Sequence, residues 1–231
     1  MDLSAIDWGE AEAGLWTAGY AHLGTLLQEV ECRELRSLDE HDHLFRSRID
    51  MARHRFGKGE YKYFAYPLPS LVAALRERLY PALSDIANRW MAALSLSTLY
   101  PRTLDSFLDH CRAYGQTRPT PLLLHYRAGD FNCLHQDLYG EVAFPLQVVF
   151  GLSKPDVEFT GGELLLIEQQ PRAQSIGRVI RLKQGDAVVI TTRYRPVKSS
   201  RGYYRANVRH GVSPIVSGER YTMGIIFHDA A

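Results

Sequence analysis

The sequence predicts an α+β protein in which a helical N-terminal part precedes a β-sandwich or barrel. Apolar residues recur every three or four positions in the first half of the chain, which is the period of an amphipathic helix. The second half consists of short, apolar, β-branched segments separated by Gly, Pro, Ser and Asp. The pattern changes near residue 120, so we expect a helical region over 1–119 that packs on a β core over 120–231.

Three segments of the first part have the helical period. The first covers residues 17–38, where Leu and Val recur at three- and four-residue steps. The second begins at Ser70 and is expected to break at Pro81, because proline cannot donate the hydrogen bond that a helix needs there. The third follows Pro101, where Thr103 provides an N-capping side chain. We expect these helices to buttress the β core.

Six segments of the second part are expected to be strands. Each is short, apolar and rich in β-branched residues, and turn residues separate it from the next. They cover residues 121–127, 143–152, 161–169, 175–183, 186–192 and 221–229. Many short strands with such turns are typical of an all-β sandwich or barrel.

Composition excludes several classes of protein. Lysine and arginine number 27 against 26 acidic residues, so the net charge of +1 indicates no particular partner. Three cysteines without a CxxC spacing favour reduced thiols over a disulfide framework or a zinc site. The N-terminus is acidic, and no run approaches the roughly 18 apolar residues of a membrane helix. We therefore expect a cytoplasmic protein without a membrane segment.

The candidate metal ligands begin with His135 and Asp137. On an extended chain, positions i and i+2 point to the same side, so one imidazole and one carboxylate can hold one metal ion. Nine histidines and 13 aspartates in 231 residues produce such a pair by chance about half the time, so it carries little weight alone. The two-histidine, one-carboxylate set that binds non-haem iron needs a third ligand from a distant strand. His210, 75 residues after His135, is that candidate.

Arg220 and Tyr126 distinguish this set from an ordinary three-ligand zinc site. Arg220 lies ten residues after His210, beyond a turn rich in Ser, Pro and Gly, and we expect a hairpin that returns it beside the ligand strand. A planar guanidinium pairs with a carboxylate through two parallel hydrogen bonds. Tyr126 lies nine residues before His135, and its phenol can donate to the same carboxylate. The two residues suit a cosubstrate with a distal carboxylate, such as 2-oxoglutarate.

Almost the whole predicted β core resembles the 2-oxoglutarate/Fe(II)-dependent oxygenase superfamily, in the branch of AlkB-like and prolyl-4-hydroxylase-like enzymes. The matching elements are YRAGDFNCLHQD, TGGELLLIEQ, GDAVVITT and RHGVSPIVSGERYTMGIIFHD. The resemblance implies a double-stranded β-helix, the jelly-roll or cupin-like fold, with iron(II) on His135, Asp137 and His210. It also implies 2-oxoglutarate on Arg220 and Tyr126, with dioxygen as the second cosubstrate.

The resemblance also implies the reaction. An enzyme of this kind couples the conversion of 2-oxoglutarate to succinate and carbon dioxide with hydroxylation of a substrate C–H bond. When the hydroxylated carbon is an N-methyl group, the product releases formaldehyde and leaves the demethylated amine, as in AlkB-type enzymes. No catalytic side chain beyond the metal ligands is implied.

Two segments are candidates for substrate binding. Residues 46–69 interleave Arg and Lys with Phe and Tyr, have neither period and form a candidate substrate lid. Residues 193–209, just before the distal metal ligand, have a similar composition. Basic residues for phosphates and aromatic residues for base stacking are typical of single-stranded nucleic-acid binding. Single-stranded or damaged nucleic acid is therefore the first candidate substrate.

Two departures from AlkB-type enzymes keep other substrates open. Those enzymes carry an acidic residue two positions after the metal aspartate, where this chain has Tyr139, and a second arginine six positions after the cosubstrate arginine, where it has Ile226. A protein side chain or a small molecule is therefore the alternative substrate. A cupin-like sensor that binds metal without turnover is a remote third interpretation, which the presence of Arg220 and Tyr126 disfavours.

Overall fold

The computed structural model describes residues 3–231, which form five α-helices, two short 3₁₀ helices and fourteen strands. The helices are α1 (Trp8–Ala18), α2 (Glu29–Ser37), α3 (Met51–His54), α4 (Ser70–Ala93) and α5 (Leu104–Ala113), with the 3₁₀ helices η1 (Leu38–Glu40) and η2 (Asp42–Leu44). The strands are β1 (Tyr20–Thr25), β2 (Phe45–Asp50), β3 (Gly57–Lys58), β4 (Glu60–Phe64), β5 (Leu122–Arg127), β6 (Phe131–His135), β7 (Leu146–Gly151), β8 (Phe159–Gly161), β9 (Leu164–Gln169), β10 (Ile176–Ile180), β11 (Asp186–Thr191), β12 (Tyr194–Ser199), β13 (Gly202–Val212) and β14 (Ile215–Ile226). Among these described helices, none is long and apolar enough to cross a membrane.

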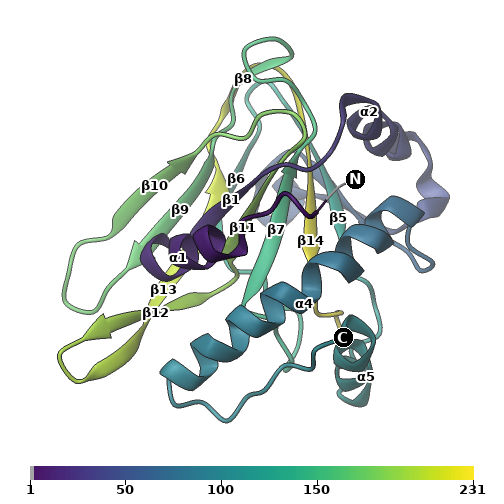
Figure 1. Cartoon of the computed structure of the whole chain (residues 1–231). Helices are drawn as coiled ribbons and strands as arrows, with labels where there is room; N and C mark the ends of the chain where they lie inside the picture. The colour runs from purple at the N-terminus through teal and green to yellow at the C-terminus, as the bar shows by residue number, and fades with distance from the viewer. Residues whose placement is uncertain (1–2) are drawn as a thin grey trace.

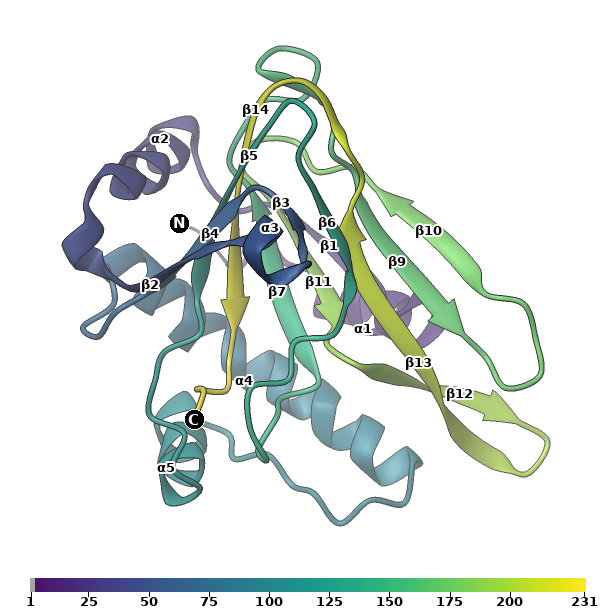
Figure 2. The same cartoon turned by 180° about the vertical axis from the view of Figure 1, so that it is seen from behind.

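Two antiparallel sheets face each other (Figures 1 and 2). The larger sheet has the order β1-β11-β7-β14-β5-β4-β2, with β8 paired to β14, and the smaller has the order β10-β9-β13-β6-β3, with β12 paired to β13. Helices α4 and α5 lie on the face of the larger sheet that is turned away from the smaller one. The predicted α+β class and jelly-roll arrangement are confirmed, although the two sheets stay separate and no barrel closes.

Strand β11 contains a continuous apolar stretch because both faces of the larger sheet are covered there. In β11, Ala187 and Val189 belong to the core that contains the helices, whereas Val188 and Ile190 pack against residues of the smaller sheet. A strand covered on both faces lacks the polar alternation of a strand with one face in water. This explains why residues 187–190 are a continuous apolar run.

The predicted helix over residues 17–38 is wrong. Helix α1 ends at Ala18, where Gly19 has a φ of 76° and closes the helix with a left-handed cap. The chain then forms β1, in which Ala21 and Leu23 are buried in alternate positions, and only afterwards α2. A few leucines spaced three or four apart are ambiguous in so short a segment. The pairing of β1 with β11 at the edge of the larger sheet decides between the two periods.

Helix α4 is continuous through Pro81, so the predicted break is also wrong. The missing N–H of Pro81 leaves the carbonyl of Glu77 without its helical partner, but both residues lie on the exposed face, where water can replace that bond. The buried face of α4 continues on both sides of the proline and packs on the larger sheet. The third predicted helix is confirmed as α5, with Thr103 as its N-cap.

Residues 46–69 contribute to both sheets. Strands β2 and β4 extend one edge of the larger sheet, β3 pairs with β6 in the smaller sheet, and α3 lies between β2 and β3 (Figure 2). The region 1–119, which we expected to be helical, therefore also supplies the four strands β1 to β4. The lid function of the segment stays a prediction.

A buried ion pair fastens the end of β14 to α4. Arg76 and Asp229 have side chains that are each 1% exposed, and Nη2 lies 2.7 Å from Oδ1. Arg76 also donates to the carbonyls of Ile226 and Phe227. We expect Arg76→Ala to lower the free energy of unfolding, measured by urea denaturation, by about 3–5 kcal/mol, because it leaves a buried charge uncompensated. Arg78→Ala, at an exposed position of the same helix, should stay within about 0.5 kcal/mol of the parent. Equal losses from both would contradict this role of Arg76.

Candidate active site

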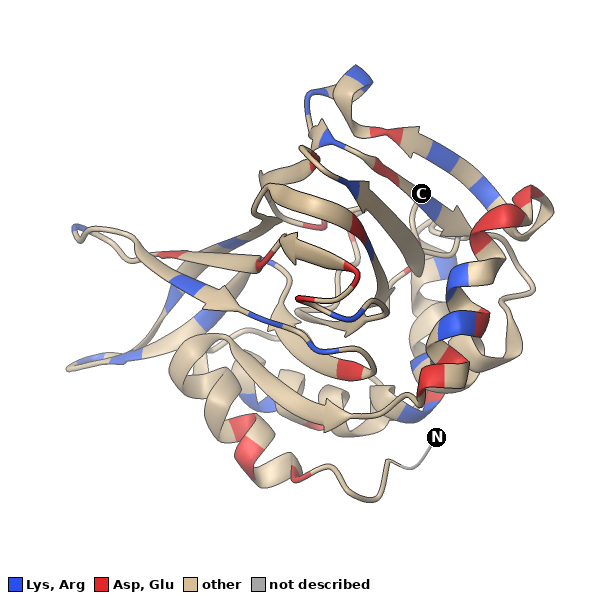
Figure 3. Ribbon diagram, turned by 90° about the horizontal axis from the view of Figure 1, so that it is seen from above, with Lys and Arg blue, Asp and Glu red and all other residues tan. Residues whose placement is uncertain are grey.

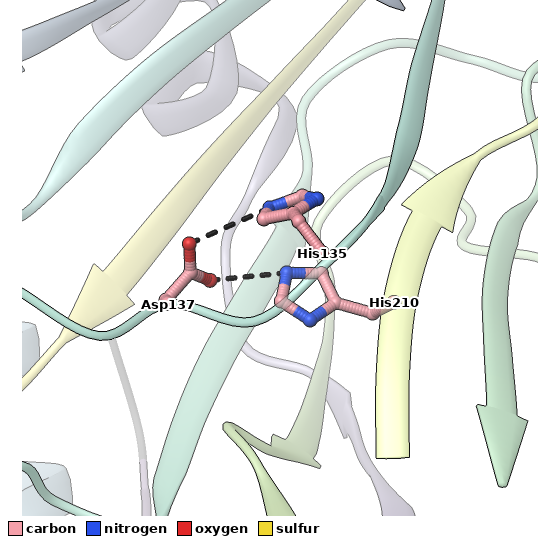
Figure 4. A group of neighbouring side chains, drawn as sticks. All are labelled: His135, Asp137 and His210. Carbon is pink, nitrogen blue, oxygen red and sulfur yellow. Dashed lines mark ion pairs between the residues drawn. The ribbon is translucent and has the colours of Figure 1, made fainter. Parts of the chain in front are cut away.

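Three side chains converge between the two sheets, those of His135, Asp137 and His210 (Figure 4). His135 is the last residue of β6, and His210 lies on β13 directly opposite it in the strand register. Asp137 Oδ2 lies 3.0 Å from His210 Nε2, and Oδ1 lies 3.4 Å from His135 Nε2. One ligand atom of each residue lies within 4.8 Å of the other two. The structure thus brings the three predicted metal ligands together.

Neighbouring groups orient the imidazole of His135 and the carboxylate of Asp137. His135 Nδ1 lies 2.8 Å from the carbonyl oxygen of Cys133, so Nδ1 carries the proton and Nε2 presents its lone pair to the site. Tyr139 donates to Asp137 Oδ1 at 2.6 Å, and Gln147 donates to Oδ2 at 2.8 Å. Both oxygens of the carboxylate are therefore held by side-chain donors.

The protonation states of the three residues suit a metal centre. Burial raises the pKa of Asp137, but the adjacent His210 and His135 outweigh burial and hold that pKa well below its usual value. Burial lowers the pKa of His210. Burial also lowers the pKa of His135, but the hydrogen bond and charge of Asp137 and the carbonyl of Cys133 together outweigh burial, and the pKa is raised. At neutral pH, Asp137 is a carboxylate and His210 is neutral, the forms in which both residues bind metals.

Arg220 and Tyr126 face each other on neighbouring strands of the larger sheet. They are direct cross-strand partners on β14 and β5, and Arg220 Cζ lies 5.6 Å from the centre of the Tyr126 ring. The predicted hairpin after His210 is wrong, because β14 pairs with β5, β7 and β8 and does not return beside β13. The chain crosses from the smaller sheet to the larger one instead. Arg220 therefore lies in the sheet opposite the strand that carries His210.

The guanidinium of Arg220 is buried without a carboxylate partner among residues 3–231. The residue is 4% exposed, and Nη1 donates to Thr222 Oγ1 at 3.4 Å. Burial lowers the pKa of Arg220, yet an arginine keeps its charge in proteins. The charge of Glu163 raises that pKa, but no carboxylate of residues 3–231 lies within ion-pair distance of the guanidinium. A buried charge with so little compensation is costly, so the arrangement indicates a place for an external anion. Tyr126 is also fully buried, and Asn132 Nδ2 donates to its hydroxyl oxygen at 3.4 Å, which leaves the phenolic proton for another acceptor.

Gly162 makes room for the stem of this arginine. Its φ is +67°, in the left-handed region that favours glycine. A Cβ at this position would lie 2.2 Å from Ile215 Cδ1 and 2.9 Å from Arg220 Cδ. The turn at residues 161–163 (GGE) therefore forms part of the wall against which Arg220 lies.

All five predicted site residues line one cavity of about 310 Å³. Aromatic side chains form much of the remaining wall: Phe56, Tyr61, Tyr63 and Tyr139. The volume lies at the lower end of the range for small-molecule sites. Gln147 also lines the cavity. No spacing in the sequence predicts its role, because it contacts Asp137 only where the two sheets face each other.

A second group of potential ligand atoms, from Asp39, Glu60 and His125, lies outside this cavity. Cationic side chains already compensate its carboxylates. Lys62 Nζ lies 3.2 Å from Asp39 Oδ1, and Arg48 Nη2 lies 2.5 Å from Glu60 Oε2. A metal ion would have to displace both cations, so we place the candidate metal centre in the cavity.

Comparison with protein families and curated proteins identifies relatives of this chain. The model of the Oxygenase-NA family, described as an oxygenase catalysing oxidative methylation of damaged DNA, matches residues 59–230. This span contains all five predicted site residues. Two curated proteins, from two strains of Mycobacterium tuberculosis, are 55% identical over 168 residues, which is 73% of this chain and 72% of each relative.

Solved structures share the arrangement of the two sheets. A 2OG-Fe(II) oxygenase family oxidoreductase from Burkholderia pseudomallei has a TM-score of 0.58 at 14% identity, covering 100% of this chain and 96% of that one. A prolyl-4-hydroxylase from Pseudomonas putida has a TM-score of 0.55 at 14% identity, covering 97% and 99%. These likenesses establish the fold, and the family match establishes the class. The chain belongs to the Oxygenase-NA family and is an oxygenase with the double-stranded β-helix fold of the 2-oxoglutarate- and iron(II)-dependent enzymes.

Proposed function

We propose that this oxygenase uses iron(II), 2-oxoglutarate and dioxygen to demethylate a base of single-stranded or damaged nucleic acid. His135, Asp137 and His210 would hold the iron, and Arg220 and Tyr126 would hold 2-oxoglutarate. One observation carries the proposal: a buried guanidinium without a carboxylate partner among the described residues lines the same cavity as two imidazoles and a carboxylate.

The residues of the cavity fit both groups. Two imidazole nitrogens and one carboxylate are the donor set typical of mononuclear iron oxygenases, and they leave adjacent coordination positions open. The fork of Arg220 and the phenolic proton of Tyr126 fit the two oxygens of a distal carboxylate. The predicted ligands and the predicted anchor lie in opposite sheets, so a cosubstrate would span the gap between them.

The chain positions the reactants, and the metal supplies the redox chemistry. Iron(II) held by His135, Asp137 and His210 would supply the activation of dioxygen, coupled to the conversion of 2-oxoglutarate to succinate and carbon dioxide. Tyr139 and Gln147 keep the carboxylate of Asp137 oriented toward the metal. Apolar side chains of the cavity wall, such as Val149 and Leu164, exclude water from the reacting groups. Hydroxylation of an N-methyl carbon gives a product that breaks down to formaldehyde and the free amine.

Aromatic and basic side chains near the cavity support a nucleic-acid substrate. Tyr61 and Tyr63 line the wall, Phe56 is 48% exposed at its edge, and Arg55 beside it has no ion-pair partner in the described part of the chain. Planar rings stack on bases, and arginines bind phosphates. Basic residues also mark the tips of the two hairpins that project from the smaller sheet (Figure 3). The description of the family names damaged DNA.

The alternative substrate is a protein side chain or a small molecule. Two positions support it, because neither carries the charged group that AlkB-type enzymes have there. Tyr139 donates a hydrogen bond to Asp137, and Ile226 is buried in the sheet. Recognition of a base would therefore depend on other residues of the cavity wall.

Substrate-stimulated formation of succinate distinguishes these alternatives. The protein is loaded with iron(II) under anaerobic conditions and then given 2-oxoglutarate, oxygen and one candidate substrate. We expect methylated single-stranded oligonucleotides to yield succinate and formaldehyde in equal amounts, and unmethylated ones to yield neither above background. Stimulation by peptides or metabolites alone would favour the alternative substrate. Metal binding without any turnover of 2-oxoglutarate would favour the sensor.

The orienting role of Tyr139 leads to a prediction about metal affinity. Tyr139→Phe removes the donor to Asp137 Oδ1 without removing the ring, so we expect iron(II) to bind about 10- to 100-fold more weakly. Anaerobic calorimetric titration measures the change. Tyr114→Phe, at an exposed position outside the cavity, is the matched control and should bind iron as the parent does. An unchanged affinity in Tyr139→Phe would mean that Gln147 is sufficient to orient the carboxylate.

We also propose that residues 120–231 are the catalytic core and residues 1–119 its support. All five candidate site residues lie in the core, and helices α4 and α5 cover the outer face of its larger sheet. Residues of α3 to β4 complete one wall of the cavity, which suits a role in covering the substrate.

A further inference from the structure

We propose that Arg46 and Arg118 form a phosphate-binding subsite beside the cavity, which holds the phosphodiester next to the base that enters it. The inference rests on the proposed nucleic-acid substrate and adds the path of the strand. Neither arginine lines the catalytic cavity, and neither belongs to the candidate metal or 2-oxoglutarate sites.

Arg46 is held by two contacts that leave most of its donors free. Nε donates to the carbonyl oxygen of Pro119 at 2.8 Å, and Cζ lies 4.4 Å from the centre of the Tyr63 ring. A guanidinium carries five N–H donors, one on Nε and four on the two terminal nitrogens. Only Nε has a hydrogen-bond partner among residues 3–231, so the four terminal donors are free. The residue is half-buried, and its orientation is therefore set before a ligand arrives.

Arg118 lies next to Arg46 in space because it precedes the proline that accepts the Arg46 hydrogen bond. A backbone bridge to Ala230 fixes its main chain, while its side chain is exposed. Burial lowers the pKa of Arg46 and the neighbouring positive charge of Arg118 lowers it further, while Tyr63 and the carboxylate of Asp229 raise it. No carboxylate lies within ion-pair distance of either guanidinium in the described chain. An anion between the two would relieve their repulsion.

Two other arginines of residues 46–69 have acidic partners, unlike Arg46. Arg48 Nη2 lies 2.5 Å from Glu60 Oε2, and Arg53 Nε lies 3.3 Å from Asp50 Oδ2. Arg46, on the same strand as Arg48, is left without an acidic partner. The basic character of residues 46–69 therefore reduces to a few free cations with defined positions.

Tyr63 connects the arginine pair to the cavity. Its ring lines the cavity wall and also carries Arg46 on its face. It meets the ring of Tyr139 edge-on at a centroid distance of 5.9 Å, and Tyr139 binds the candidate ligand Asp137. When a base contacts Tyr63 from the cavity, the free donors of Arg46 lie on the same tyrosine ring and are available to a phosphate of that nucleotide.

A phosphodiester is the ligand that this arrangement fits. Two guanidinium groups can share one phosphate through charge-assisted hydrogen bonds, and a planar fork matches the geometry of its oxygens. An uncharged metabolite or a proline-containing peptide has no group for this position. The subsite thus favours a polymeric nucleic acid over a free nucleoside.

Oligonucleotide binding in a salt series tests the subsite without turnover. The full-length, metal-free protein binds a labelled, methylated single-stranded oligonucleotide, and the logarithm of the affinity is plotted against that of the salt concentration. Each lost phosphate contact reduces the magnitude of the slope by about 0.7. We expect this reduction in the double variant Arg46→Ala/Arg118→Ala, because the two arginines share one phosphate, and a smaller reduction in Arg118→Ala, which keeps Arg46. Arg33→Ala/Arg78→Ala removes the same charge from exposed positions on α2 and α4 and should keep the parental slope.

Two further variants and a smaller substrate keep the test decisive. Arg118 is exposed, so its replacement does not endanger the fold, and Arg46→Lys should retain most of the slope that Arg46→Met loses. The KM for a methylated nucleoside, which has no phosphate, should be the same in the parent and the double variant. A raised KM there, or equal slopes in the double variant and its control, would overturn the subsite and leave the nucleic-acid substrate standing. Failure of the parent to bind or turn over any oligonucleotide would overturn the proposed function and the subsite together.

Discussion

Replacement of His135 by alanine is expected to abolish iron(II) binding and the turnover of 2-oxoglutarate. The variant leaves one imidazole and one carboxylate at the candidate centre, which is too few to hold a labile divalent ion. The loss should exceed the roughly 10- to 100-fold that removal of an outer-shell partner costs. Metal content after anaerobic loading and desalting measures binding independently of activity. The side chain of His135 is 36% exposed, so its truncation should leave the fold intact.

His22→Ala is the matched control for this experiment. His22 is exposed on β1, at the edge of the larger sheet and outside the cavity. The control should load iron as the parent does. Full loading of His135→Ala would remove His135 from the ligand set.

Arg220→Ala is expected to raise the concentration of 2-oxoglutarate required for half-maximal binding by about 10²- to 4 × 10³-fold. Breaking a buried ion pair costs about 3–5 kcal/mol, and each 1.4 kcal/mol is a factor of ten in a binding constant. Iron affinity should stay unchanged, because Arg220 lies in the sheet opposite the strand of His210. Thermal stability of the free protein should not fall, since the change removes a buried charge that has no carboxylate partner in the described chain. Anaerobic calorimetric titration of the metal-loaded protein measures the affinity.

Two variants complete the test of the anchor. Arg220→Lys should recover part of the affinity, because an ammonium keeps the charge but lacks the fork that binds both carboxylate oxygens. Arg127→Ala changes an exposed arginine on β5, beside Glu219, and should bind 2-oxoglutarate normally. Parental affinity in Arg220→Ala would mean that another cation holds the distal carboxylate.

The candidate site could be predicted from the sequence where short-range geometry controls it. The two-residue period of an extended chain predicts that His135 and Asp137 share a face, and the two side chains do meet although β6 itself ends at His135. His210 and Arg220 belong to the same C-terminal stretch, and their order along the chain carries the resemblance. His135, His210 and Arg220 lie on β6, β13 and β14, Asp137 follows β6 in the connection to β7, and all four line one cavity.

The residues that hold the site in place could not be predicted in the same way. Gln147 is an ordinary polar residue in an apolar strand, and it meets Asp137 only because β7 and β6 lie in facing sheets. In the sequence, Tyr139 is notable only because AlkB-type enzymes have an acidic residue at its position. In the structure, it donates the hydrogen bond that holds Asp137. Hydrogen bonds between sheets depend on how the two layers pack, and the spacing of residues along one strand does not predict that packing.

Errors in the predicted fold have the same origin. Residues 17–38 have the leucine spacing of a helix, but Gly19 ends α1. The residues that follow pair with β11 at the edge of the larger sheet and form β1. The expected hairpin at Arg220 fails because β14 finds its partners in the larger sheet. In both places several local conformations were compatible with the sequence, and pairing with a distant strand selected one of them.

For this protein, the sequence by itself determined the class of fold, the order of the chemical groups and the oxygenase resemblance, because periodicity and side-chain chemistry are local properties. Only the tertiary structure decided that Arg220 lies opposite the candidate metal ligands, buried and without a carboxylate partner in the described chain, and that Arg46 lies over the ring of Tyr63 with Arg118 nearby. The physical reason is that burial and charge compensation depend on which distant residues come into contact, and the pairing and facing of the two sheets determine those contacts.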